Sequence, residues 1–197
     1  MHPFILAGLT LTLLLPLKTT WADNTTSLAQ YGAYNISSAS QQASTQSDIE
    51  ITQTGNDKGG AYNTASASQR SSNNSSIRIY TEGEHNFATT NQQHVDSTQA
   101  EIQQNVQAEA NLARIEQADL LNSGANILQR GSGENTAIIQ QSGSHTTAAL
   151  AVQDHSYLSE AIISQSASSA STAAIHQIDI SDSRASIAQT LSPHSEA

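Results

Sequence analysis

Residues 111–189 repeat one twelve-residue unit without an insertion: NLARIEQADLLN (111–122), SGANILQRGSGE (123–134), NTAIIQQSGSHT (135–146), TAALAVQDHSYL (147–158), SEAIISQSASSA (159–170), STAAIHQIDISD (171–182) and SRASIAQ (183–189). The unit reads Asn, Ser or Thr, then x-Ala-x-Ile-x-Gln, with alanine replacing isoleucine only at Ala151. A fixed period kept over so many units is the signature of a repeat architecture. It argues against merely low-complexity polar sequence.

Three residue types recur at alternate positions of this unit. The alanines are Ala113, Ala125, Ala137, Ala149, Ala161, Ala173 and Ala185. The isoleucines are Ile115, Ile127, Ile139, Ile163, Ile175 and Ile187, and the glutamines are Gln117, Gln129, Gln141, Gln153, Gln165, Gln177 and Gln189. A period of two is that of a β-strand. We therefore expect these residues to point to one face and the variable residues between them to the other.

The N-terminal half carries the same unit less regularly. Its glutamines are Gln30, Gln41, Gln53, Gln69, Gln92 and Gln104. Thr81 takes the glutamine position in the unit that begins at Ser75, and a Gly-rich insertion at 56–60 predicts a surface loop. The repeat array thus runs from 28 to 189. The stretch Glu101 to Leu121, taken alone, could form a helix, but the repeat phase continues through it and favours strands.

Glycines mark the expected turns. Five lie two residues after the glutamine or threonine position: Gly32, Gly55, Gly83, Gly131 and Gly143. Glycine adopts positive φ without steric cost, as a tight turn requires. From Gln153 onward this glycine is replaced, by His155, Ala167, Asp179 and Leu191.

These features predict an all-β fold, a β-solenoid with two strands per rung. About seven rungs of ~24 residues, stacked at ~4.8 Å, would make a column on the order of 34 Å tall. Inside it, glutamine amides of successive rungs can donate to one another's carbonyl oxygens, as in cross-β ladders. The last unit is as regular as the others, so nothing in the sequence caps the stack. We therefore expect cross-β fibre formation by end-to-end addition.

Composition limits the other possibilities. Hydrophobic residues make up 37% of the chain and aromatic residues 4%, so a conventional globular core is not expected. Cysteine is absent, which excludes disulfides and thiolate metal sites. Seven Lys and Arg stand against seventeen Asp and Glu, which disfavours binding to nucleic acid or to anionic membranes.

The N-terminus predicts secretion. An apolar run from Phe4 to Leu17 is too short to span a membrane and precedes Thr20-Trp21-Ala22, a plausible cleavage site. We interpret residues 1–22 as a signal peptide, 23–27 as a short N-terminal segment, 28–189 as the repeat array and 190–197 as a tail. The expected location is extracellular, on the cell surface, reached through the periplasm.

Several units resemble curlin repeats. The family pattern is roughly S-x5-Q-x-G-x-x-N-x-A-x3-Q, and its second half is matched by Asn86-x-Ala88-x3-Gln92 and Asn63-x-Ala65-x3-Gln69. Residues 75–92 keep the whole frame except at Thr81. The resemblance implies a bacterial amyloid fibre subunit that serves adhesion and biofilm formation. It also implies self-association, a second curlin subunit and an outer-membrane export pore as partners.

The resemblance leaves the subunit type open. Residues 28–92 look more like the major fibre subunit, and residues 113–189 more like the minor, nucleating one. A monomeric β-solenoid adhesin is a further alternative, although the outward positions are irregular. We expect no enzyme, since no nucleophile elbow or phosphate-binding loop is present. We expect no cofactor, small-molecule substrate or metal either, because the histidines lack ligand spacing on one face.

Overall fold

The computed structural model describes residues 12–14, 23–55, 62–131, 133–143, 145–166 and 172–189, with only the backbone given for 12–14 and 106–108. Sheet A contains β1 (Thr12–Leu14), β3 (Ile36–Gln42), β5 (Thr64–Arg70), β7 (Phe87–Gln93), β9 (Leu112–Ala118), β11 (Thr136–Ser142), β13 (Glu160–Ser166) and β15 (Arg184–Gln189). Sheet B contains β2 (Thr25–Tyr31), β4 (Asp48–Thr54), β6 (Ser76–Glu84), β8 (Gln99–Glu109), β10 (Gly124–Arg130), β12 (Ala148–Asp154) and β14 (Thr172–Ile178). Among these residues no helix is long and apolar enough to cross a membrane.

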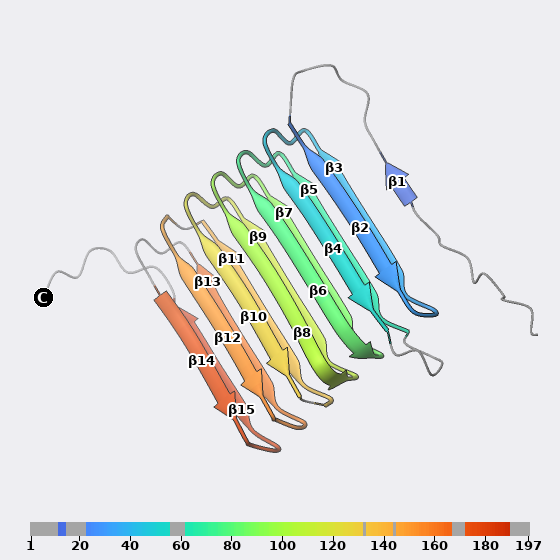
Figure 1. Ribbon diagram of the computed structural model, residues 1–197. Helices are drawn as coiled ribbons and strands as arrows, with labels where there is room; N and C mark the ends of the chain where they lie inside the picture. The colour runs from blue at the N-terminus through green and yellow to red at the C-terminus, as the bar shows by residue number, and fades with distance from the viewer. Residues whose placement is uncertain are drawn as a thin grey trace, which may run out of the picture.

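Each sheet consists of parallel strands, and the two sheets face each other (Figure 1). Because the chain alternates between them, each strand pairs with the strand two places along the chain, and β2–β15 form a column of two-stranded rungs. The registers align identical unit positions: Ala113 lies beside Ala137, Ile115 beside Ile139 and Gln117 beside Gln141. The predicted β-solenoid with two strands per rung is confirmed.

The core is a thin layer of alanine and isoleucine between the sheets. Ile51, Ile79, Ile102, Ile115 and Ile127 are completely inaccessible to solvent. Alternation explains this, since every second residue of a strand points inward. Alanine at the neighbouring inward position lets the sheets approach closely, so few large side chains are needed. Strands β8 and β9 also occupy the stretch that could have formed a helix.

Two local features differ from the simple repeat. The first strand of sheet B, β2, begins at Thr25, because Thr25 and Thr26 already pair with Asp48 and Ile49. The array therefore includes part of the segment 23–27. A register shift between β6 and β8 follows Thr81, where β8 is longer than its neighbours.

Candidate functional site

A continuous glutamine ladder runs through sheet A. It contains Gln41, Gln69, Gln92, Gln117, Gln141, Gln165 and Gln189. At each step Nε2 of one glutamine donates to Oε1 of the next, over 2.8 to 3.1 Å. Nε2 also reaches the facing sheet: that of Gln165 donates to the carbonyl of Ala148 at 3.2 Å. The ladder therefore joins successive rungs and also the two sheets.

The ladder of sheet B is interrupted once. Gln30 donates to Gln53, and Gln104, Gln129 and Gln153 each donate to the following glutamine, over 2.8 to 3.0 Å. Thr81 lies between Gln53 and Gln104 in register. Its side chain is too short to continue the chain of amides. Among the described residues, Nε2 of Gln53, Oγ1 of Thr81 and Oε1 of Gln104 are consequently buried without a hydrogen-bond partner.

The first residue of each unit forms a second kind of ladder. At the start of the sheet A strands, Oδ1 of Asn63 accepts from the backbone N–H of Asn86 at 3.0 Å, and Oδ1 of Asn111 accepts from that of Asn135 at 2.9 Å. At the start of the sheet B strands after β2 a hydroxyl replaces the amide, as where Oγ of Ser75 accepts from the N–H of Thr98 at 3.3 Å. These side chains satisfy backbone donors at the turns, which would otherwise be costly to bury.

The structure places every predicted ladder residue on the inner face of the column. Those of the inner rungs are buried. Only the ladder residues of the terminal rungs are half-buried: Gln30, Gln41, Ala185, Ile187 and Gln189. They lack the neighbouring rung that would complete their burial.

The turn glycines conform to the prediction at four of five positions. Gly32, Gly83, Gly131 and Gly143 have positive φ. Gly55 does not, which corrects the prediction. The backbones of the two turns lie close together here, since a Cβ added to Gly32 would lie 3.0 Å from the Cα of Gly55.

Loss of the glycine does not change the turn. His155 and Asp179 occupy the same position with φ of 48° and 52°. The corresponding positions 167 and 191 lie outside the described residues. A second positive φ recurs three residues further on, for example at Glu134, Thr146 and Asp182. Sequence reasoning missed this position because no residue type marks it.

Sequence reasoning also missed an inward residue within the turns. Ser44, Ser72, Val95, Leu120 and Ser156 are buried. Each lies three residues after a glutamine of the ladder. They close the sides of the column between the sheets. The apolar type of Val95 and Leu120 was the only available signal, and the turn context concealed it.

Both ends of the column present open strand edges. No described strand lies beyond β14 and β15 at the C-terminal end, or beyond β2 at the N-terminal end (Figure 1). β3 is covered over three residues by β1, a contact that the sequence did not predict. The ends also differ in polarity, because every ladder amide directs Nε2 toward the C-terminal end and Oε1 toward the N-terminal end.

No family model, curated protein or solved structure matches this chain.

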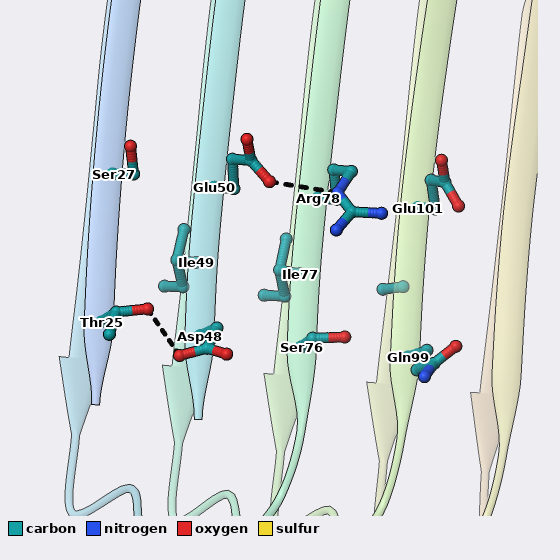
Figure 2. Close-up of a pocket in the computed structure, with 11 residues that line it drawn as sticks. Thr25, Ser27, Asp48, Ile49, Glu50, Ser76, Ile77, Arg78, Gln99 and Glu101 are labelled. Carbon is teal, nitrogen blue, oxygen red and sulfur yellow. Dashed lines mark hydrogen bonds and ion pairs between the residues drawn. The ribbon is translucent and has the colours of Figure 1, made fainter. Parts of the chain in front are cut away.

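A shallow depression of about 280 Å³ crosses the outer face of β2, β4, β6 and β8. Figure 2 shows Arg78 between Glu50 and Glu101, with Nε of Arg78 3.1 Å from Oε2 of Glu50. These side chains are solvated and lie on the outer face, as expected from their positions in the strands. Within the described parts of the chain, no group of three His, Asp or Glu residues could hold a metal ion.

The outer face of sheet A carries similar charged pairs. Arg114 contacts Glu116, and Nε of Arg184 lies 3.0 Å from Oε2 of Glu160. A hydrogen bond from Gln140 holds the pKa of Glu116 below its usual value, with help from Arg114 and against the effect of burial. The Arg184–Glu160 pair and the Gln140–Glu116 hydrogen bond link neighbouring strands, whereas Arg114 and Glu116 belong to the same strand.

Proposed function

We propose that this chain is the structural subunit of an extracellular bacterial fibre of the curlin type, which grows by stacking copies end to end and serves adhesion and biofilm formation. The observation that carries the proposal is the match between the two ends. Gln177 and Gln189 direct amide donors outward at one end, while Gln30 presents an acceptor oxygen at the other. Oε1 of Gln41 accepts from Oγ1 of Thr26 at 3.1 Å and has a second lone pair for the next copy. In a continued column, β2 of one copy lies on β14 of the next, and β3 lies on β15.

The match extends beyond the glutamines. Leu28 would lie beside Ile175, and Ala39 beside Ile187, so inward apolar residues meet inward apolar residues at the junction. The half-buried ladder residues of both terminal rungs would become buried. Apolar burial contributes ~25 cal/mol per Å², and each completed amide contact ~1 kcal/mol, so the same forces that hold the column would join two copies.

The proposal gives residues 1–22 a role before export. β1 lies within this segment and pairs with β3. Cleavage of the predicted signal peptide would therefore remove the strand that covers the β3 edge. We further propose that the chain is exported through an outer-membrane pore, contacts a second curlin subunit and has no enzymatic activity.

The test compares two chains, one beginning at Met1 and one at Asp23, each diluted from denaturant. Thioflavin T fluorescence and electron microscopy follow assembly. We expect the chain from Asp23 to form fibres after a lag that preformed seeds shorten, and the full chain to assemble more slowly. Assembly without a lag, together with seeding of a partner curlin, would indicate the nucleator. A stable β-rich monomer that never polymerises would refute the fibre and favour the monomeric adhesin.

A further inference from the structure

The two long edges of the column differ in character. The turns from sheet B to sheet A, with the strand residues that flank them, form what we call the aromatic edge (residues 31–36, 62–64, 82–87, 109–112, 130–136, 154–160 and 178–184, those described). The turns from sheet A to sheet B, with their flanking residues, form the polar edge (42–48, 70–76, 93–99, 118–124, 142–148, 166 and 172, those described). In Figure 1 the aromatic edge is the lower row of turns.

Every exposed large hydrophobic residue of the described chain lies on the aromatic edge. In the N-terminal rungs these are Tyr31, Tyr34, Ile36, Tyr62, Phe87 and Leu112. In the C-terminal rungs they are Tyr157, Leu158, Ile178 and Ile180. Their exposed fractions range from 36% to 63%. Gathered apolar exposure of this kind marks an interaction surface, whereas scattered single residues do not.

Several of these rings are already held in place. The rings of Tyr34 and Tyr62 stack at 4.9 Å between centroids, and Tyr62 stacks on His85 at 5.3 Å. The ring of Tyr157 covers Gly133, and its Oη donates to Glu134 over 3.1 Å. Rings ordered before binding lose little conformational freedom on contact with a partner. The aromatic edge is therefore preorganised for binding a partner.

Charge indicates the chemistry of the partner. The aromatic edge carries eight carboxylates against two guanidinium groups, those of Arg130 and Arg184, among its described residues: Glu82, Glu84, Glu109, Glu134, Asp154, Glu160, Asp179 and Asp182. The polar edge carries only Asp48, Asp96 and Asp119 against Arg70 among its described residues. A hydrogen bond to Glu134, and the nearby charges of Glu134, Glu109 and Asp182, raise the pKa of Tyr157. A cation placed over this ring would meet both the carboxylates and the π face.

A second copy of this chain does not supply that charge. Edge-to-edge pairing would bring carboxylates against carboxylates. Arg78, Arg114 and Arg184 are each engaged by a glutamate of a neighbouring or the same strand. No described face therefore offers an excess of positive charge.

Backbone pairing also restricts the mode of binding. Bridges join Glu109 to Gly133, Gly133 to Tyr157 and Tyr157 to Ser181 along this edge. Since these turn backbones already bond to each other, a partner contacts side chains and does not add a strand. An extended segment advances ~3.3 Å per residue, so about ten residues span the column on the order of 34 Å tall.

We propose that the aromatic edge binds an extended segment of a basic, apolar partner protein, in which Lys or Arg alternates with aliphatic or aromatic residues. The site is present in each single copy, so it goes beyond the fibre role and does not depend on it.

The test uses the full chain immobilised at low density and three synthetic peptides: Lys-Leu-Lys-Tyr, Lys-Ser-Lys-Ser and Glu-Leu-Glu-Tyr, each repeated three times. We expect measurable affinity for the first alone. Substituting Glu84→Gln, Glu109→Gln and Asp182→Asn together should weaken it about tenfold and flatten its salt dependence. Substituting Tyr31→Ser, Ile36→Ser and Ile178→Ser together should weaken it several-fold and leave the salt dependence unchanged.

The matched control is Asp96→Asn with Asp119→Asn on the polar edge, which should bind the peptide as the wild type does. Circular dichroism checks that each variant keeps its β signal. Equal binding of the Lys-Ser peptide, or equal weakening by the polar-edge control, would reduce the effect to net charge and overturn the proposal. So would self-association of the chain that the Tyr31, Ile36 and Ile178 variant abolishes, because a second copy would then be the occupant.

Discussion

Two threonines occupy inward positions that other residue types hold in neighbouring rungs. Thr81 stands in the glutamine ladder of sheet B, and Thr90 stands in the isoleucine row of sheet A. Both hydroxyls are buried without a hydrogen-bond partner. An unsatisfied buried polar group costs ~1–3 kcal/mol. These positions are thus the weakest points of the inner ladders, and each suggests a stabilising substitution.

Thr81→Gln should restore the interrupted ladder. Its amide would accept from Nε2 of Gln53 and donate to Oε1 of Gln104, which satisfies two buried groups. We expect the free energy of unfolding to rise by ~1–3 kcal/mol, measured by urea unfolding at the lowest usable protein concentration. The matched variant Thr81→Leu fills the space without the amide and should gain less. A loss of stability in Thr81→Gln, with the leucine variant unaffected, would contradict the ladder.

Thr90→Val should also stabilise the chain. It exchanges an unpaired hydroxyl for a methyl group among buried residues, for an expected gain of ~1 kcal/mol. Thr98→Val is the control, because Oγ1 of Thr98 accepts from Gln92 at 3.3 Å and contacts Oγ of Ser75 at 3.2 Å. This second change should be destabilising. Thermal unfolding of both variants distinguishes them, and shifts of the same sign would refute the assignment.

At the scale of strands and turns, the sequence predicts the regular part of the fold. The alternation Ala113, Ile115, Gln117 determines which face is buried, and the twelve-residue phase determines the register. The turns are less predictable. His155 and Asp179 adopt the same backbone as Gly131, because stacking on the previous rung holds it regardless of residue type.

The different character of the two edges is not visible in the linear sequence. Successive units look alike, but they belong alternately to the two sheets. Their turns therefore lie on opposite sides of the column. Tyr34, Tyr62 and Tyr157 fall on the same edge only because each follows a strand of sheet B. This assignment requires knowledge that β2 pairs with β4, and so on along the sheet. The interruption at Thr81 was visible in sequence, but its unpaired neighbours required the structure.

Gly32→Ala tests the close approach of two turns. Gly32 has φ of +94°, and an added Cβ would lie 3.0 Å from Cα of Gly55, a backbone atom that cannot move aside cheaply. We expect a loss of ~1–3 kcal/mol in urea unfolding. Gly124→Ala is the matched control, since nothing lies within 4 Å of its added Cβ. That change should be neutral or stabilising by ~0.5 kcal/mol. Equal effects at both sites would contradict the geometry.

The two ends of the column differ in their hydrogen-bonding groups, and both the backbone and the glutamine side chains contribute to this polarity. The N–H of Thr136 donates to the carbonyl of Ser159 in the next rung, and that of Glu160 donates to Ser183. Thr136 and Glu160 have outward side chains. Because N–H groups of alternate residues point to the same side of a strand, outward residues donate toward the C-terminal end throughout. In β15 these are Arg184, Ser186 and Ala188, and their donors face an open edge.

Ser186→Pro should consequently separate folding from fibre growth. Proline removes one forward donor, whereas Ala185 and Ile187 keep their pairing with β13, and proline is tolerated on an edge strand. We expect a folded chain whose elongation, followed by seeded thioflavin T fluorescence, is slowed about tenfold or more. The mutant should also cap wild-type seeds when it is added in excess. Ser186→Ala should grow normally, and Ile138→Pro, at the same position within sheet A, should unfold the column. Normal growth of Ser186→Pro would mean that this end does not template the next copy. If the β15 edge does bind the incoming strand, loss of the hydrogen bond from the N–H of residue 186 must slow its addition.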